Sequence, residues 1–233
     1  SFCTLLMASL LLLLFAAVGA MLVLAWTSFR LRKSKSRGTR AKVDAIVLSG
    51  PSGVGKGTLI KRLMETRPDT FAFCVSHTSR PPRDGEVDGV NYHFSSKSNM
   101  QTMLEKGEFL ECCEVHGNMY GTSRSALREV QASGKVPIIE IDVQGAQKLK
   151  KQQGDMSFYY MFINAPSVEE LEKRIRGRGQ ESDDKVQTRL NTARAEIAFM
   201  EANRSFFDKV LTNVDLEESL AVMNRLFKLY CGL

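Results

Sequence analysis

Short runs of consecutive apolar residues alternate along this chain with longer stretches in which apolar residues recur every three or four positions. The runs are typical of strands buried on both faces, and the periodic stretches are typical of helices with one apolar face. Strands are predicted at residues 45–48, 138–142, 158–163 and 210–211. Helices are predicted after residue 58, from 167 to 174, from about 184 to 202 and from 216 to 230. The alternation predicts an α/β fold with a parallel sheet covered by helices.

The segment between residues 73 and 122 interrupts this alternation. It contains short β-prone pieces at 73–76, 92–94 and 109–115, separated by glycines. We therefore expect a small inserted β subdomain over about residues 73–125. At the next helix, Ser167 followed three residues later by Glu170 is a capping-box signal for the N-terminus.

A glycine-rich sequence, GPSGVGKGT, follows the first predicted strand and precedes the first predicted helix. It has the G-x-x-x-x-G-K spacing of a phosphate-binding P-loop. Backbone N–H groups and the helix N-terminus would surround a phosphate, and Lys56 would bring a full charge to it. The candidate ATP-binding residues of this loop are Gly50, Pro51, Ser52, Gly53, Val54, Gly55, Lys56, Gly57 and Thr58.

The eighth position of this motif is Gly57, where Ser or Thr usually supplies a hydroxyl to Mg²⁺. We expect Mg²⁺ to be held mainly by ATP oxygens and water, with Thr58 as a further candidate. Mg²⁺ commonly keeps several water ligands, so the missing hydroxyl does not argue against the metal.

The positive charge of the chain is concentrated near its start. Residues 1–29 contain no charged side chain, and residues 30–42 contain seven basic and no acidic residues. Subtracting these seven from the 32 Lys and Arg residues leaves 25, against 26 acidic residues. Residues 43–233 are therefore close to neutral, and the net charge of +6 does not indicate nucleic-acid binding.

The apolar segment 1–29 is long enough to cross a bilayer as a helix, and Trp26 suits an interface. We predict a membrane anchor, a basic tether at 30–42 and a domain at 43–233 that faces the cytosol. A cleaved signal peptide, a mitochondrial presequence and a spurious extension are the alternatives. In the last case the domain would be cytosolic without an anchor.

The cysteines and histidines suggest no metal site. Cys3, Cys74, Cys112, Cys113 and Cys231 include no C-x-x-C pair, which favours reduced thiols. We assign no catalytic role to any of the three histidines.

A second anion site is predicted in the inserted segment, where Arg80 and Arg83 lie three residues apart in a proline-stiffened loop. Arginine presents planar, bidentate donors to phosphate. The run T-S-R-x-x-R-x-x-E-x-x-G-x-x-Y-x-F from Thr78 to Phe94 resembles the signature of the guanylate kinase family. The resemblance covers residues 43–233 and implies phosphoryl transfer from ATP to GMP by a monomeric kinase domain.

The resemblance also implies roles for the matching residues. The GMP phosphate would be bound by Arg80, Arg83, Tyr92 and Tyr120, and the guanine by Ser76, Glu111, Thr122 and Asp142. Asp142 would also orient Mg²⁺ through water. Arg174 and Arg178 would belong to a lid over about residues 174–190, Arg189 would reach the transferring phosphoryl group, and Asn213 would lie near the adenine. The catalytic residues would be Lys56, Arg178 and Arg189.

Two departures from the family pattern stand near the implied site. Cys112 and Cys113 follow Glu111 where an aromatic residue is common, and Glu140 replaces an Asp. Neither removes a group that the reaction requires. Two alternatives remain open: a noncatalytic guanylate-kinase-like interaction module, and a monophosphate kinase for another base.

Overall fold

The computed structural model describes residues 43–115, 117–177 and 182–231. The predicted apolar segment 1–29, the basic tether 30–42 and the catalytic candidate Arg178 lie outside these residues. Among the residues that are described, no helix is both long and apolar enough to cross a membrane.

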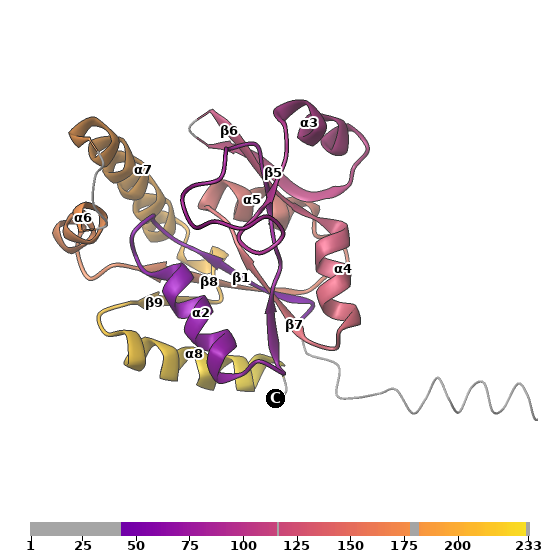
Figure 1. Ribbon diagram of the computed structural model, residues 1–233. Helices are drawn as coiled ribbons and strands as arrows, with labels where there is room; N and C mark the ends of the chain where they lie inside the picture. The colour runs from indigo at the N-terminus through magenta and orange to yellow at the C-terminus, as the bar shows by residue number, and fades with distance from the viewer. Residues whose placement is uncertain (1–42, 116, 178–181, 232–233) are drawn as a thin grey trace, which may run out of the picture. The chain divides into compact units, whose positions relative to one another are not determined.

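A five-stranded parallel sheet forms the centre of the domain, with the strand order β2-β7-β1-β8-β9 (Figure 1). Its strands are β1 (Ala45–Ser49), β2 (Phe71–Phe73), β7 (Val136–Glu140), β8 (Phe158–Asn164) and β9 (Lys209–Thr212). The central strand β1 pairs on both sides, so that Val47 lies beside Ile139 of β7 and Tyr160 of β8. The predicted α/β fold with a parallel sheet is confirmed.

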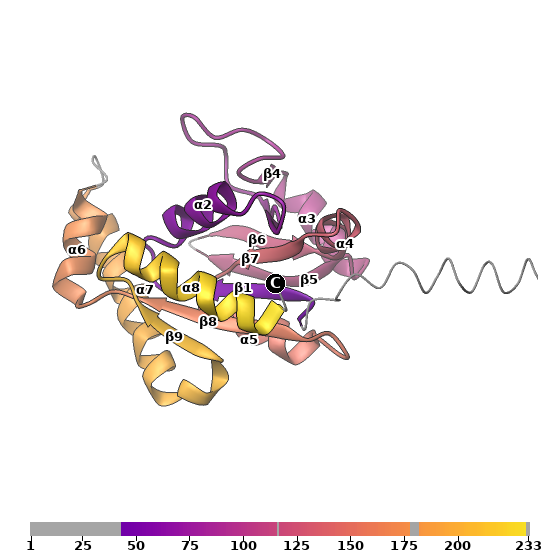
Figure 2. The same ribbon diagram turned by 90° about the horizontal axis from the view of Figure 1, so that it is seen from below.

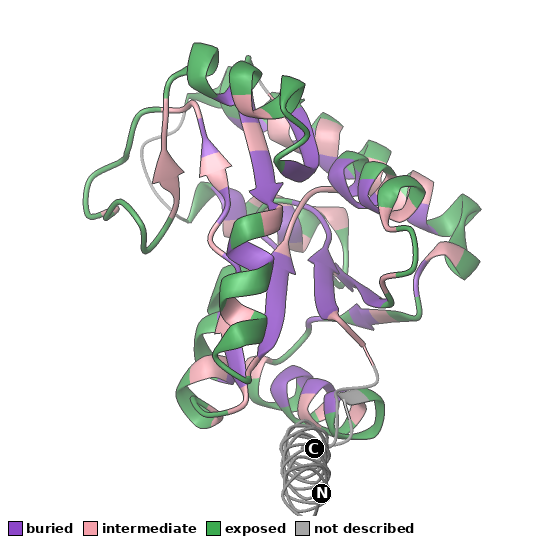
Figure 3. Cartoon of the chain, turned by 90° about the vertical axis from the view of Figure 1, so that its right-hand side faces the viewer, coloured by how far each residue is buried: buried purple, intermediate pink, exposed green. Residues whose placement is uncertain are grey.

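Helices cover both faces of this sheet. They are α2 (Lys56–Thr66), α4 (Arg124–Ala132), α5 (Val143–Gln152), α6 (Val168–Arg176), α7 (Asp183–Ala202) and α8 (Leu216–Cys231), with a 3₁₀ turn at Arg204–Phe206. Ile46 and Leu48 face a core shared with α2, α6, α7 and α8, whereas Ala45 and Val47 face a core shared with α4 and α5. Successive strand residues point to opposite faces, which explains why these strands are apolar throughout. Figure 2 shows α8 beside α2, and Figure 3 shows the buried strands between exposed outer helix faces.

A second sheet of four strands has the order β4-β3-β6-β5. It is built from β3 (His77–Thr78), β4 (His93–Phe94), β5 (Phe109–Val115) and β6 (Asn118–Ser123), and helix α3 (Lys97–Glu105) packs on it. Strands β5 and β6 form an antiparallel hairpin, and β3 pairs with β4 in parallel. This sheet lies within the segment for which we predicted an inserted β subdomain.

The strand expected at residues 73–76 is divided differently from the prediction. Phe73 ends β2, which joins the large sheet through β7, and the small sheet begins only at His77. Phe71 packs edge-on against Phe227 of α8, with ring centroids 5.7 Å apart, which holds β2 in the large sheet. Helices α3, α4 and α5 were not predicted either. In α3, Met100 is the one buried residue and leaves almost no periodic apolar signal.

The predicted cap at Ser167 is present in part. The Ser167 hydroxyl accepts a hydrogen bond from the Glu170 N–H at 3.1 Å. The Glu170 carboxylate pairs with Arg174 Nε at 2.9 Å. The helix therefore starts where the sequence predicts, while Glu170 serves an ion pair one turn further on.

Candidate active site

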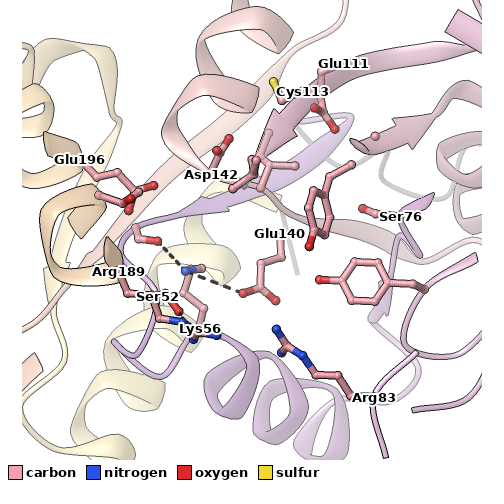
Figure 4. A pocket seen from close by; sticks show the side chains of 17 residues that line it. Ser52, Lys56, Ser76, Arg83, Glu111, Cys113, Glu140, Asp142, Arg189 and Glu196 are labelled. Atoms are coloured by element: carbon pink, nitrogen blue, oxygen red, sulfur yellow. Dashed lines mark hydrogen bonds and ion pairs between the residues drawn. The ribbon is translucent and has the colours of Figure 1, made fainter. Parts of the chain in front are cut away.

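A cleft of about 300 Å³ opens at the carboxyl ends of β1 and β7, between the large sheet, the small sheet and α7 (Figure 4). Crevices at this edge of open α/β sheets are the usual ligand sites of such folds. The lining residues are Gly50, Ser52, Lys56, Ser76, Arg83, Tyr92, Glu111, Cys113, Val115, Tyr120, Gly121, Glu140, Ile141, Asp142, Arg189, Thr192 and Glu196. The cleft thus combines residues of both predicted anion sites.

The glycine-rich loop leaves β1 in a conformation that only glycine adopts easily. Gly50, Gly53 and Gly55 all have positive φ, at 140°, 95° and 96°. A Cβ on Gly50 would lie 2.0 Å from the Ile163 carbonyl oxygen of β8. The first turn of α2 contains no acidic residue, and its N–H groups have no intrahelical partners, so this end of the helix favours an anion.

The side chain of Lys56 folds back onto this loop. Its Nζ donates to the Gly50 carbonyl at 2.5 Å and to the Pro51 carbonyl at 3.1 Å, and it lies 3.9 Å from Glu140 Oε1. The ammonium group is therefore held within the loop that the sequence assigns to phosphate. Gly57 and Thr58 lie in the exposed first turn of α2.

Helix α7 forms one wall of the cleft. Arg189, Thr192 and Glu196 line it at helical spacing, and Arg189 Nη1 donates to Ser52 Oγ at 3.3 Å. Glu196 Oε1 accepts from the Val143 N–H at 3.4 Å. Burial raises the pKa of Glu196, while nearby Lys56 lowers it. Thr192 and Glu196 were not predicted, although their spacing from Arg189 was a usable signal.

Glu111 of β5 is a buried carboxylate, 4% exposed, at the small-sheet end of the cleft. Its Oε1 accepts from the Thr122 N–H at 2.8 Å, and the Ser76 and Thr122 hydroxyls lie 3.3 Å apart. Burial raises the pKa of Glu111 to about 7, and Asp142 adds to the rise, whereas hydrogen bonding by Thr122 and the charge of Lys148 oppose it. Glu111 is therefore an acceptor whose charge changes near neutral pH.

Asp142 caps helix α5, where its Oδ1 accepts from the Gly145 N–H at 2.7 Å. It follows β7 directly, as the sequence predicts, and lines the cleft. Cys113 also lines the cleft, but burial raises the pKa of its thiol to about 12, so this cysteine is a poor nucleophile.

The predicted phosphate-binding arginines are placed differently from each other. Arg83 lines the cleft together with Tyr92 and Tyr120. Arg80 is not among the lining residues, because its guanidinium forms an ion pair with Glu86 at 2.8 Å.

Arg174 and Asn213 lie behind the phosphate loop and do not line the cleft. Asn213 Nδ2 donates to the Val54 carbonyl at 2.7 Å, and Arg174 Nη1 donates to the Asn213 carbonyl at 3.1 Å. These two residues therefore support the loop in this structure, and their contact with ATP stays a prediction.

A parallel sheet, a P-loop at the carboxyl end of its central strand, and the arginines Arg83 and Arg189 in the same cleft as Lys56 define a P-loop kinase fold. A family model described as guanylate kinase matches residues 42–230. The chain is 47% identical over 184 residues to "Guanylate kinase 1" of Oryza sativa subsp. japonica, covering 79% of this chain and 47% of that protein. It is 44% identical over 178 residues to "Guanylate kinase" of Schizosaccharomyces pombe, covering 76% of this chain and 87% of that protein.

A solved structure points to the same family. The crystal structure of guanylate kinase from Anaplasma phagocytophilum matches with a TM-score of 0.64 and 30% identity, covering 82% of this chain and 87% of that one. The chain spans about half the length of the rice relative and of "Guanylate kinase 1" from Arabidopsis thaliana. The chain belongs to the guanylate kinase family.

We predict that Gly50→Ala destabilises the protein by at least about 2 kcal/mol, because the new methyl group would meet the Ile163 carbonyl. Urea unfolding followed by circular dichroism measures the change. Gly57→Ala is the matched control, since a Cβ there meets nothing within 4 Å and alanine favours a helix. Equal stabilities for the two variants would contradict this account of the loop.

Proposed function

We propose that this chain transfers the γ-phosphoryl group of ATP to the phosphate of GMP, giving ADP and GDP. One observation carries the proposal: Lys56 in the phosphate loop, and Arg83 and Glu111 on the opposite side, line the same cleft. A donor polyphosphate and an acceptor nucleotide could therefore meet without leaving the protein. The family relationship supports the same reaction.

On the donor side, the phosphate loop would cradle the ATP phosphates through its backbone N–H groups. Lys56 would move its charge from the Gly50 and Pro51 carbonyls to the β- and γ-phosphates. Arg189 and the predicted lid residue Arg178 would add cations beside the transferring group. Arg174 and Asn213 would stabilise the loop and approach the adenine.

The residues present fit a Mg²⁺ ion that arrives with ATP. No cluster of three or more potential ligands among His, Cys, Asp and Glu exists within the described part of the chain. Mg²⁺ is typically bound through substrate phosphates, waters and one or two protein groups, and Asp142 lines the cleft together with the phosphate loop. Asp142 through water, and Thr58, would be the protein groups. When bound, the ion would neutralise charge on the phosphates.

On the acceptor side, the buried carboxylate Glu111 can accept from the N1–H and N2–H₂ groups that guanine presents side by side. Adenine would place a lone pair against the same carboxylate. Ser76 lines the cleft, and the Thr122 hydroxyl lies 3.3 Å behind it, so these hydroxyls would serve the guanine O6, with Asp142 in the same cleft. A wrong base would leave buried polar groups unpaired, at about 1–3 kcal/mol each.

The reaction needs no covalent enzyme intermediate. A GMP phosphate oxygen forms a bond to the γ-phosphorus as the bond to the β–γ bridging oxygen breaks, and ADP leaves. Lys56, Arg83 and Arg189 would hold the groups in line and balance the charge that develops. Closure of the lid over about residues 174–190 would exclude water.

We predict that Lys56→Met lowers kcat by at least about a hundredfold, because a positive charge near the transferring group is lost. The measurement is a coupled assay of the full chain with ATP, Mg²⁺ and each of GMP, AMP, CMP and UMP. Circular dichroism checks that the variant is folded. Normal turnover by the variant would contradict the proposed role of Lys56, and preference for another monophosphate would favour a kinase for that base.

A wild-type protein that binds GMP yet turns over none of the four monophosphates would instead support the noncatalytic module. The presence of Lys56 and Arg189 in the cleft argues against this alternative.

We predict that kcat/KM for GMP falls as the pH drops below about 7, because protonated Glu111 can no longer accept from both guanine donors. The loss approaches about tenfold per pH unit for one ionisation. Glu111→Gln should abolish this fall in kcat/KM at low pH and weaken the selectivity for GMP. KM for ATP should stay nearly unchanged. The phosphate of GMP itself ionises near pH 6, which affects both proteins equally. The pH profile of the wild-type protein is therefore compared with that of Glu111→Gln. Identical pH profiles for the two proteins would contradict the assignment of Glu111 to the guanine.

We also propose that residues 1–29 anchor the chain in a membrane, with the basic residues 30–42 at the cytosolic surface. The proposal rests on the sequence alone: the uncharged segment is followed at once by seven basic residues. The full chain, expressed in cells, should remain in the pellet after carbonate washing, and residues 43–233 should be released. Release of the full chain as well as of residues 43–233 would contradict the anchor and favour the cytosolic alternative.

A further inference from the structure

Gly145 lies in the first turn of α5, at a place where the backbone does not require glycine. Its backbone is helical, and glycine within a helix is about 1 kcal/mol less stable than alanine. The residue is buried, and its N–H donates to Asp142 Oδ1 at 2.7 Å. An explanation for glycine here must therefore come from the space that a side chain would occupy.

A Cβ atom at position 145 would meet three groups at once. It would lie 3.1 Å from Glu111 Oε2, 3.2 Å from Asp142 Oδ1 and 3.2 Å from Ile141 Cβ. These distances are shorter than an ordinary van der Waals contact, and a methyl group could not move away from one group without approaching another. The missing side chain therefore leaves the room in which the carboxylates of Glu111 and Asp142 converge. Both residues line the cleft (Figure 4).

Strand β5, which carries Glu111, is tied to α5 and cannot easily retreat from it. Leu110 of β5 shares a buried core with Ala146 of α5. Lys148 of the same helix donates from Nζ to the Cys112 carbonyl at 2.8 Å. A side chain at position 145 would therefore displace the Glu111 carboxylate rather than the whole strand.

Bringing the two carboxylates together does not stabilise the fold. Burial and, less strongly, the charge of Asp142 raise the pKa of Glu111 to about 7, which means that the ionised form of Glu111 is disfavoured here. A glycine within a helix and two acids close together each lower the stability of the protein. The room at Gly145 thus has a reason other than folding.

We propose that Gly145 is a positioning residue of the acceptor site: its missing side chain lets Glu111 lie beside Asp142, so that both carboxylates face the hydrogen-bond donors of the acceptor base. Gly145 does not line the cleft itself and acts through Glu111. The inference rests on the proposed function and deepens it, because it concerns the end of the cleft that would read the guanine.

The expected signature is a split between the kinetic constants. Gly145→Ala should raise KM for GMP about tenfold, because the displaced carboxylate loses the geometry of one hydrogen bond from the base. The preference for GMP over AMP should fall with it. The phosphate loop is untouched, so kcat and KM for ATP should change by less than about twofold. The control is Lys151→Ala, on the exposed side of the same helix, which should leave all these constants unchanged.

A double-mutant cycle tests whether position 145 acts through Glu111. Glu111→Asp shortens the side chain and withdraws its carboxylate from the new methyl group, at the expense of weaker GMP binding. In that background, Gly145→Ala should raise KM for GMP by less than about a further twofold. Additive losses would overturn the proposal, because position 145 would then act independently of Glu111.

Further outcomes also decide the question. An unchanged KM for GMP in Gly145→Ala, or an equal rise in KM for ATP, would overturn the proposal. Urea unfolding shows whether each variant is folded. If Gly145→Ala does not fold, recovery of folding on adding Glu111→Asp would support the proposed clash, and failure to fold in both backgrounds would overturn it.

The test remains separate from the proposed function. If the wild-type chain transfers no phosphoryl group, the proposed reaction fails. Calorimetric titration of the full chain with GMP then gives dissociation constants for the same variants in place of KM. Non-additive weakening of GMP binding would support the role of Gly145, and unchanged or additively weakened binding would overturn it. A wild-type chain that binds no GMP would overturn it as well.

Discussion

The pairing of β1 with β7 on one side and β8 on the other is the constraint on which the rest of the structure depends. All three strands run in parallel and are buried on both faces, so their register cannot shift without exposing apolar side chains. Their carboxyl ends consequently meet at one edge. The phosphate loop follows β1 there and Asp142 follows β7, so chain segments about 90 residues apart share one cleft.

Several charged groups of the cleft have hydrogen-bond partners within the protein. Lys56 is satisfied by loop carbonyls and lies near Glu140, and the carboxylates of Glu111 and Asp142 each accept a backbone N–H. Burying an unpaired charge would cost several kcal/mol, which explains this arrangement. Ligand binding would therefore exchange internal partners for substrate atoms. The net binding free energy would be smaller than the sum of the new contacts, because internal contacts are lost. It would favour ligand groups that match the existing donors and acceptors.

Much of the site followed from local sequence patterns. The P-loop spacing located Lys56 and the strained glycines, and the run from Thr78 to Phe94 located Arg83 and Tyr92. Other features could not be seen in this way. Glu196 approaches Val143 across 53 residues, and nothing local to either marks the contact. The different surroundings of Arg80 and Arg83 also escape the sequence, because both fit the same phosphate-binding pattern.

The sequence by itself determined the class of fold and predicted the residues that we assign to the site. Continuous apolar strands require a sheet covered on both faces, and a glycine-rich turn before a helix favours an anion-binding backbone. Only the tertiary structure decided that Phe71–Phe73 joins the large sheet, and that the Glu111 carboxyl is buried enough to titrate near pH 7. It also decided which of the two arginines faces the cleft. Burial and pairing depend on what packs against a residue from distant parts of the chain, and no local pattern encodes that.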